Sequence, residues 1–249
     1  MDIWQAVDGK AHIKPLITNI HRLVESQEQI ATLSLADDIY AQGILEELLE
    51  TSKAPDEYRY SNLHYLLKTP FRYPPLTYGS RFGSSYEQGI FYASLHISTA
   101  LAETAYYRFV FMAGPEIPYE HVISSEYTAF TIAVKTDRAM LLDQWPFDAY
   151  EAVLTSPTSY QATQTLGSNM RLHEVTLFRY ISARDKSKGK NIGVFTPDVF
   201  CKQKPSHLTQ WLCQAKFHEV GFISLEDSSR FLFKEEDFWK DGKFPSPAV

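Results

Sequence analysis

The sequence predicts an α+β fold, in which a mixed β-sheet core is flanked by helices and preceded by a helical extension. Residues 12–52 carry apolar side chains at helical spacing, whereas short aromatic and β-branched runs separated by turn residues begin near residue 60. These runs do not alternate strictly with helices, which favours an α+β domain over a doubly wound one. A chain of 249 residues that is 44% hydrophobic and 14% aromatic can bury the core that such a fold needs.

Residues 1–58 are predicted to form the N-terminal helical region. One apolar stripe at helical spacing consists of Leu16, Ile20, Leu23, Val24 and Ile30. A second stripe consists of Ala41, Ile44, Leu45, Leu48 and Leu49. Pro15 suits the first turn of one helix, and Asp37 and Asp38 suit the start of the other. Such stripes usually mark core packing, although a helix pair outside the sheet also suits a dimer or partner surface.

A polar break at residues 51–56 separates this region from a second domain at residues 59–249. The strands expected in the second domain are 70–73, 89–94, 127–135, 138–142, 174–183, 191–196, 220–224 and 230–233. The helices expected there are 98–110, 147–154 and 206–217.

Composition and motifs argue against several classes of function. The net charge of −6 without a basic block argues against direct nucleic-acid binding. The N-terminus lacks the features of a signal peptide, and no apolar run approaches a membrane span of about 18 residues, so we expect a cytoplasmic protein. No dinucleotide-binding or Walker loop and no His-Glu-x-x-His motif occurs. No metal site is predicted, because the spacing of the following residues is unlike that of zinc modules: Cys201, His207, Cys213 and His218.

The junction between the strand at 89–94 and the helix at 98–110 carries the first candidate site. Alternation places Tyr92 on one face of the strand, and small alanines let the following helix lie close to the sheet with Glu103 near the strand. An aromatic ring and a carboxylate at such a junction suit a cationic, ring-bearing substrate. Taken singly, Tyr92 reads as a core residue and Glu103 as an acid on a helix surface.

Arginines in otherwise apolar surroundings form the second candidate feature. Arg72 is expected on a strand beside Tyr73, Arg81 in a glycine-bounded loop, and Arg184 on one strand face with Ser182. A guanidinium matches phosphate oxygens in pairs and keeps its charge on burial, so two arginines beside a hydroxyl can form an anion cradle. A single strand arginine more often pairs with an acid or snorkels, and only the joint pattern favours a site.

Five motif blocks, in this order, resemble the RES-domain toxin family, which is named for its Arg, Glu and Ser. The blocks are Phe71-Arg-Tyr73, Gly79-Ser-Arg-Phe-Gly83, Gly89-Ile-Phe-Tyr-Ala-Ser94, Thr99-Ala-Leu-Ala-Glu103, and Tyr180-Ile-Ser-Ala-Arg184 with Gly189-Lys-Asn-Ile-Gly-Val-Phe195. The resemblance covers roughly residues 65–215. The segment at 104–173 is longer than in the commoner pattern and could insert a lid or a partner surface.

The resemblance implies an ADP-ribosyltransferase-like fold, NAD+ as substrate, inorganic phosphate as co-substrate, and pairing with an antitoxin in a bacterial toxin–antitoxin system. Carried over position by position, it assigns the catalytic roles to Arg72, Glu103 and Ser182. It assigns further substrate-binding positions to Tyr73, Arg81 and Tyr92, and more weakly to Arg184. No separate cofactor is expected, and a homo-oligomer remains open.

The expected reaction is therefore cleavage of the nicotinamide–ribose bond of NAD+. Phosphate as the nucleophile gives nicotinamide and ADP-ribose 1″-phosphate, whereas water gives free ADP-ribose. Two alternatives remain: ADP-ribose transfer to a protein or small-molecule acceptor, and a catalytically silent domain that docks a partner.

Overall fold

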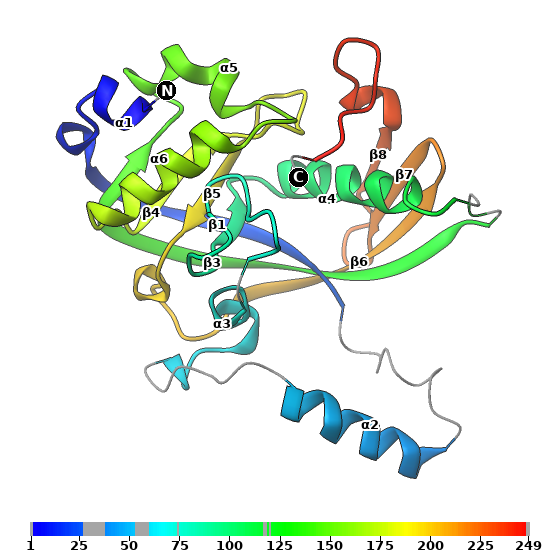
Figure 1. The fold of residues 1–249 in the computed structure, drawn as a ribbon. Helices are drawn as coiled ribbons and strands as arrows, with labels where there is room; N and C mark the ends of the chain where they lie inside the picture. The colour runs from blue at the N-terminus through cyan, green and yellow to red at the C-terminus, as the bar shows by residue number, and fades with distance from the viewer. Residues whose placement is uncertain are drawn as a thin grey trace.

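An eight-stranded sheet forms the centre of the computed structural model, which describes residues 2–26, 38–52, 60–73, 75–116, 119 and 121–247 (Figure 1). The strands are β1 Lys14–Glu25, β2 Phe91–Ser94, β3 Ile123–Leu141, β4 Leu177–Ile181, β5 Lys190–Val194, β6 Ser206–Lys216, β7 Glu219–Ser224 and β8 Arg230–Lys234. The α-helices are α1 Ile3–Ala6, α2 Ile39–Ser52, α3 Tyr65–Arg72, α4 Ile97–Met112, α5 Glu151–Leu154 and α6 Gln161–Leu172. Short 3-10 turns are η1 Gly9–His12, η3 Phe147–Tyr150, η4 Pro197–Val199 and η5 Glu235–Phe238.

The sheet is mixed and partly closed on itself. The strand order is β1-β2-β5-β4-β3-β6-β7-β8, and an additional pairing of β1 with β3 closes the first five strands into a ring. Only the β3–β4 pairing is parallel among the pairings of named strands in the described chain. The 19-residue β3 joins the two parts, because it pairs with β1 and β4 in the ring and with β6 in the open extension. The predicted α+β class with a mixed sheet is confirmed.

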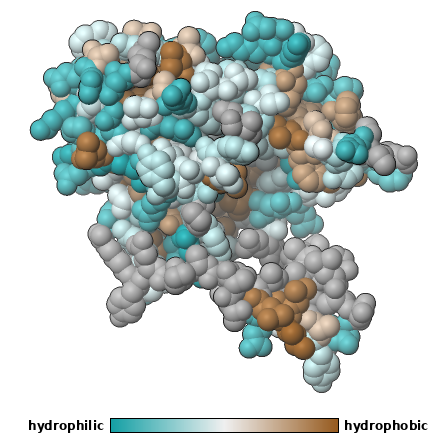
Figure 2. Space-filling view, viewed as in Figure 1, coloured by the Kyte–Doolittle hydropathy of each residue, from teal (hydrophilic) through white to brown (hydrophobic). Residues whose placement is uncertain are grey.

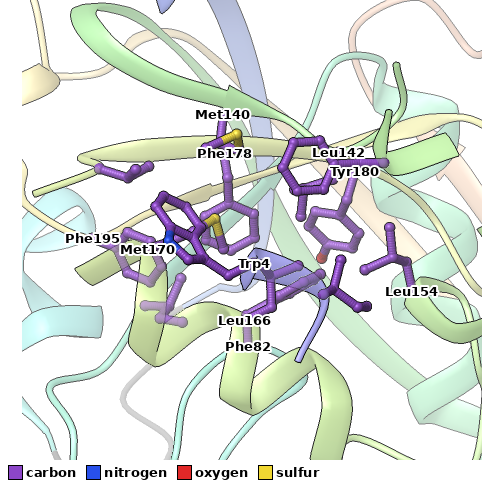
Figure 3. Close-up of a cluster of buried hydrophobic side chains, with 14 residues drawn as sticks. Trp4, Phe82, Met140, Leu142, Leu154, Leu166, Met170, Phe178, Tyr180 and Phe195 are labelled. Carbon is purple, nitrogen blue, oxygen red and sulfur yellow. The ribbon is translucent and has the colours of Figure 1, made fainter. Parts of the chain in front are cut away.

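Helices cover the sheet on separate patches, each over its own apolar cluster. Helix α4 packs Leu101, Ala105 and Phe109 against the extension formed by β6–β8. Helices α1 and α6 pack over β4, where Trp4, Met170 and Phe178 belong to one buried cluster (Figure 3). A third cluster around Phe91, Ile132 and Ile192 joins the ring strands to α3.

Three predicted elements have the wrong type, and the first is the helix expected from residue 12 to about 30. Residues 14–25 form β1, which pairs with β3 from Lys14↔Ala139 to Glu25↔Tyr127. Leu16 and Ile20 suit a helix by their spacing, but both also lie an even number of residues apart and share one strand face. The N-terminal residues are thus part of the central sheet and not of a separate helical region. The predicted helices also include parts of residues 27–37, which lie outside the residues that the structure describes.

The strand expected at 70–73 and the helix expected at 206–217 are also wrong. Residues 65–72 form α3, which buries Leu66, Leu67 and Phe71 on one face. Residues 206–216 form β6, where alternate side chains at Trp211, Cys213 and Ala215 are buried. The expected strands at 127–135 and 138–142 are one continuous β3, and helix α6 was not predicted.

The second N-terminal helix is confirmed as α2. Asp38 begins it, because its carboxylate accepts the backbone N–H groups of Tyr40 and Ala41 at 2.8 Å each. Ile44 is 61% exposed, and Figure 2 shows apolar surface gathered on this helix. No helix within the described ranges is long and apolar enough to cross a membrane.

Candidate functional site

A cavity of about 500 Å³ opens where α4 approaches the ring strands. One face of α4 lines it with Ala100, Glu103, Thr104 and Tyr107, which recur at helical spacing of three and four residues. Strand β1 contributes His21 and Arg22, β2 contributes Tyr92 and Ser94, and the loop at 76–81 closes another side. The volume lies within the range of small-molecule and cofactor sites.

Glu103 is held from behind by two donors that both reach the same carboxylate oxygen. Ser182 Oγ and Asn191 Nδ2 donate to Glu103 Oε1, each at 2.6 Å. Ser182 Oγ in turn accepts the backbone N–H groups of Arg184 and Asp185 at 3.1 Å, so its proton is directed at the carboxylate. No described residue bonds Glu103 Oε2, which remains for a ligand in the cavity.

Tyr92 lines the cavity with its ring and uses its hydroxyl within the protein. The hydroxyl accepts the Phe82 N–H at 3.1 Å and lies 2.9 Å from Ser80 Oγ. Burial raises the pKa of Tyr92 to about 12, although these hydrogen bonds and nearby arginines oppose that rise. The phenol therefore stays neutral and fixes the loop that carries Arg81.

Two of the predicted arginines line the cavity and are anchored by backbone carbonyls of the segment after β3. Arg81 Nη1 donates to Ser156 O at 2.7 Å, and its guanidinium lies 4.6 Å from the Tyr160 ring centroid. Arg184 Nη2 donates to Pro157 O at 2.9 Å, and its guanidinium lies 3.5 Å from the Tyr106 ring centroid. A guanidinium has five N–H donors, so both arginines retain donors for a ligand.

A third arginine, Arg22 on β1, lines the cavity and was not predicted from the sequence. Its Nη1 donates to Tyr92 O, its guanidinium lies 4.7 Å from the Phe91 ring centroid, and its buried Nε has no hydrogen-bond partner among the described residues. Burial lowers the pKa of Arg22 to about 10, which leaves it charged at neutral pH. A buried cation in the wall of a cavity suits an anionic ligand. The sequence signal was present in His21-Arg22, but those residues were assigned to a helix.

Arg72 and Tyr73 lie apart from this arrangement. Arg72 is the last residue of α3, its guanidinium is 5.8 Å from the Tyr73 ring centroid, and neither residue lines the cavity. Of the predicted site residues, the structure therefore gathers Arg81, Tyr92, Glu103 and Arg184 around the cavity and places Ser182 directly behind Glu103. The helix at 65–72 explains the difference, because Arg72 was expected on a strand and lies instead at the end of α3.

Segments outside the predicted motifs complete the walls. Tyr107 and Tyr160, both within the long 104–173 segment, line the cavity. Pro247 lines it from the other end of the chain, where Phe244 stacks on Tyr106 at 5.2 Å and Tyr106 OH donates to Pro245 O at 2.7 Å. Burial raises the pKa of Tyr106 to about 12.

The charges around the cavity favour an anionic ligand. Among the described lining residues, Arg22, Arg81 and Arg184 are cations and Glu103 is the carboxylate. The lining also includes five tyrosines: Tyr78, Tyr92, Tyr107, Tyr160 and Tyr180. The arrangement suits a ligand with phosphate groups, a planar ring and a centre of developing positive charge. No group of three His, Cys, Asp or Glu side chains in the described residues is placed to hold a metal ion.

A family model matches more than half of the chain. The family model described as the RES domain matches residues 56–214. Among solved structures, the chain is similar to the M. tuberculosis MbcT–MbcA toxin–antitoxin complex, with 9% sequence identity and a TM-score of 0.49. That similarity covers 83% of this chain and 90% of the matched chain. No curated protein matches the sequence significantly.

Proposed function

Because the chain belongs to the RES domain family, we propose that it is a toxin that cleaves the nicotinamide–ribose bond of NAD+. The observation that carries this proposal is the single carboxylate of Glu103, which faces a cavity otherwise charged by Arg22, Arg81 and Arg184. NAD+ has matching parts: an anionic pyrophosphate, two flat rings, and a ribose carbon that becomes positively charged as the bond breaks.

The arginines would hold the pyrophosphate and so orient the ribose. Arg22 lines the cavity as a buried cation, so a phosphate group there would supply a counter-charge. Arg81 and Arg184 are already fixed by carbonyls and rings, which lowers the entropy cost of using their remaining donors. Tyr92, Tyr107 and Tyr160 provide the ring faces against which nicotinamide and adenine would pack.

Glu103 would stabilise the transition state. Nicotinamide leaves as a neutral molecule, because the electron pair of the broken C–N bond cancels the charge of its ring. No strong acid is needed, and the difficult part is the oxocarbenium-like charge on the ribose, as in glycoside cleavage. Glu103 Oε2 would accept a ribose hydroxyl and stabilise that charge, while Oε1 stays bonded to Ser182 and Asn191.

Inorganic phosphate is the proposed nucleophile. A phosphate oxygen forms the new bond to the ribose carbon as the C–N bond breaks, which yields nicotinamide and ADP-ribose 1″-phosphate. The excess of cations in the cavity supports a second anion beside the pyrophosphate. Water in place of phosphate would yield ADP-ribose.

The test is to incubate the purified protein with NAD+ and follow nicotinamide by chromatography and phosphorus products by ³¹P NMR, with and without phosphate. Phosphate-dependent release with a new phosphomonoester signal is expected. Release only when an acceptor protein is added would identify an ADP-ribosyltransferase instead. If no nicotinamide forms under any condition, NAD+ cleavage is refuted.

We also propose a cognate antitoxin that covers the cavity and a cytoplasmic site of action, where NAD+ is the substrate. Leu76 and Tyr78 line the cavity and are 81% and 60% exposed, which places apolar surface at its rim. A protein that buries this rim excludes NAD+. Co-expression with the cognate antitoxin should restore growth, and Leu76→Asp should weaken the complex in pull-downs. If Leu76→Asp leaves complex formation unchanged, the rim is not the docking surface.

A further inference from the structure

Asn191 lies in the wall of the cavity, where β5, β2 and β4 pair and α4 approaches. It lies on β5, opposite Ser94 of β2 on one side and opposite Tyr180 of β4 on the other. Its amide reaches across to Glu103 on α4. Ser94 and Asn191 are each 3% exposed, so bulk water cannot replace either of them as a hydrogen-bond partner.

Both ends of the amide are in use, and this fixes its orientation. Nδ2 donates to Glu103 Oε1 at 2.6 Å, and Oδ1 accepts from Ser94 Oγ at 2.7 Å. A flipped amide would turn Oδ1 toward the carboxylate and would leave a buried hydroxyl without its acceptor. Ser94 thus selects the orientation in which Asn191 presents a donor to Glu103.

The fixed orientation of Asn191 gives the two carboxylate oxygens of Glu103 different roles. Asn191 on β5 and Ser182, the residue directly after β4, converge on Oε1, which restrains the carboxylate against rotation about its last bond. Oε2 is left toward the cavity without a protein donor among the described residues. A carboxylate fixed in this way can meet a developing positive charge without first reorganising.

We propose that Asn191, oriented by Ser94, is a positioning residue that holds Glu103 with Oε2 facing the substrate ribose. This inference rests on the proposed NAD+ cleavage for its kinetic consequences, but its structural part concerns only Glu103 and its neighbours. Both polar atoms of the Asn191 amide are bonded to Glu103 and Ser94, so in this proposal Asn191 acts through Glu103.

Other ionisable groups face Glu103 and bear on any test by pH. Tyr106 and Tyr107 share its helix, Tyr180 lies on β4, and Tyr160 and Arg184 approach from the loops. Burial raises the pKa of Tyr106 to about 12 and also raises the pKa values of Tyr107 and Tyr180. Those three phenols therefore keep their protons between pH 5 and pH 9. Burial, and then the nearby His96, lower the pKa of His21, which lines the same cavity, from its ordinary value of 6.5.

The decisive variant is Asn191→Asp, which keeps the shape of the side chain and the acceptor for Ser94. It replaces the donor to Glu103 with a carboxylate oxygen. Two ionised carboxylates side by side repel each other, so one of them keeps a proton up to a higher pH than an isolated carboxylate does. We expect kcat at neutral pH to fall about tenfold to a hundredfold, as for a lost hydrogen bond to a charged group. The acid limb of the kcat profile should move up by about one pH unit or more, with KM for NAD+ changed less than about threefold.

Asn169→Asp is the matched control. Asn169 Nδ2 donates to Asp2 Oδ1 at 3.2 Å on α6, so the same substitution again sets a carboxylate beside a carboxylate, but away from the cavity. Its pH profile should match that of the wild type. Ser94→Ala should reproduce part of the loss of kcat, about threefold to tenfold, because the amide is then free to flip.

A measurement without substrate separates this inference from the proposed function. Carboxyl-carbon NMR of ¹³C-labelled protein follows the protonation of Glu103 directly, and its midpoint should rise in Asn191→Asp and stay unchanged in Asn169→Asp. If the wild type releases no nicotinamide, NAD+ cleavage fails while this titration still tests the contact. If folded Asn191→Asp retains both the wild-type pH profile and the wild-type titration midpoint, the positioning role is refuted.

Discussion

The hydroxyl of Tyr92 fixes the loop that carries Arg81, and its removal should loosen the position of Arg81. Tyr92→Phe leaves the buried Phe82 N–H and Ser80 Oγ without their partner, so we expect a loss of about 1–2 kcal/mol in unfolding free energy. KM for NAD+ should rise because Arg81, between those two residues, is less firmly placed. Urea denaturation and nicotinamide release measure the two effects. Tyr86→Phe, at a phenol that is 84% exposed, is the control. Unchanged stability and KM in Tyr92→Phe would contradict this role.

Replacing Arg22 should affect substrate binding and folding stability in different ways. Arg22→Met removes a buried cation whose Nε has no partner among the described residues and keeps much of its apolar contact with Phe91. Because an unpaired buried charge is costly, stability should hold or rise. The kcat/KM for NAD+ should fall about a hundredfold or more, as when one preorganised donor is lost. Thermal denaturation and nicotinamide release give both readouts, and a kcat/KM within threefold of the wild type would remove Arg22 from the substrate site.

At the scale of elements, Asp143 ties β4 to β5. Its fully buried side chain lies 2.8 Å from Arg179 Nε and 2.6 Å from Lys190 Nζ, next to Asn191. Burial alone would raise the pKa of Asp143, but the hydrogen bonds and charges of Arg179 and Lys190 outweigh it and lower that pKa. The register of β5, which carries Asn191, relative to β4 is therefore supported by the ionised carboxylate of Asp143.

Asp143→Asn should destabilise the protein by about 3 kcal/mol at pH 7, the low end for a broken buried pair because Lys190 is 42% exposed. A folded-state pKa below the ordinary value of 3.8 means that this stabilisation is present above pH 4 and is lost as the pH falls further. Denaturation curves of both proteins should therefore converge in acid. A constant difference from pH 7 to pH 3 would disagree with this account.

The elements that were predicted correctly are those in which the spacing of apolar residues fits either a helix or a strand, but not both. Strand β2 and helix α4 follow each other across a polar break, and both were found within a few residues. Strands β1 and β6 were misassigned because apolar residues four apart satisfy helical and strand periods alike. In β6 the alternation of Trp211, Cys213 and Ala215 was the better guide.

At the scale of the molecule, the fold extends beyond the matched RES region. Strand β1 precedes residues 56–214, yet it closes the ring with β3 and buries Ile20 completely. A chain starting at residue 56 should show no cooperative thermal transition, because the edge of β3 and its apolar face lose their partner. Ile20→Ala in the full chain should cost about 2–5 kcal/mol and still unfold cooperatively. Circular dichroism and calorimetry check both, and a cooperative transition in the shortened chain would show that β1 is dispensable.

The sequence predicted those site residues that lie close together along the chain. It did not predict those that are brought to the cavity by the pairing of strands far apart in the sequence. Arg81, Tyr92 and Glu103 lie within one stretch of 23 residues, so local pattern was enough to group them. Arg72 and Arg22 are alike as residue types, and only the pairing of β1 with β2 at His21↔Ser94 brings Arg22 to the cavity. Asn191 was within a matched motif, but its role depends on contacts across three elements.

Arg22, near one end of the chain, and Pro247, near the other, both line the cavity, and the partly buried Phe244 packs against the cluster that contains Tyr106. Synthesis proceeds from the amino end, so Glu103 and all three lining arginines leave the ribosome before this last wall. A nascent chain whose residues 244–247 are still in the exit tunnel lacks the contact of Tyr106 with Pro245 and one side of the pocket. We expect the cavity of such a chain to bind no NAD+ until residues 244–247 have left the tunnel.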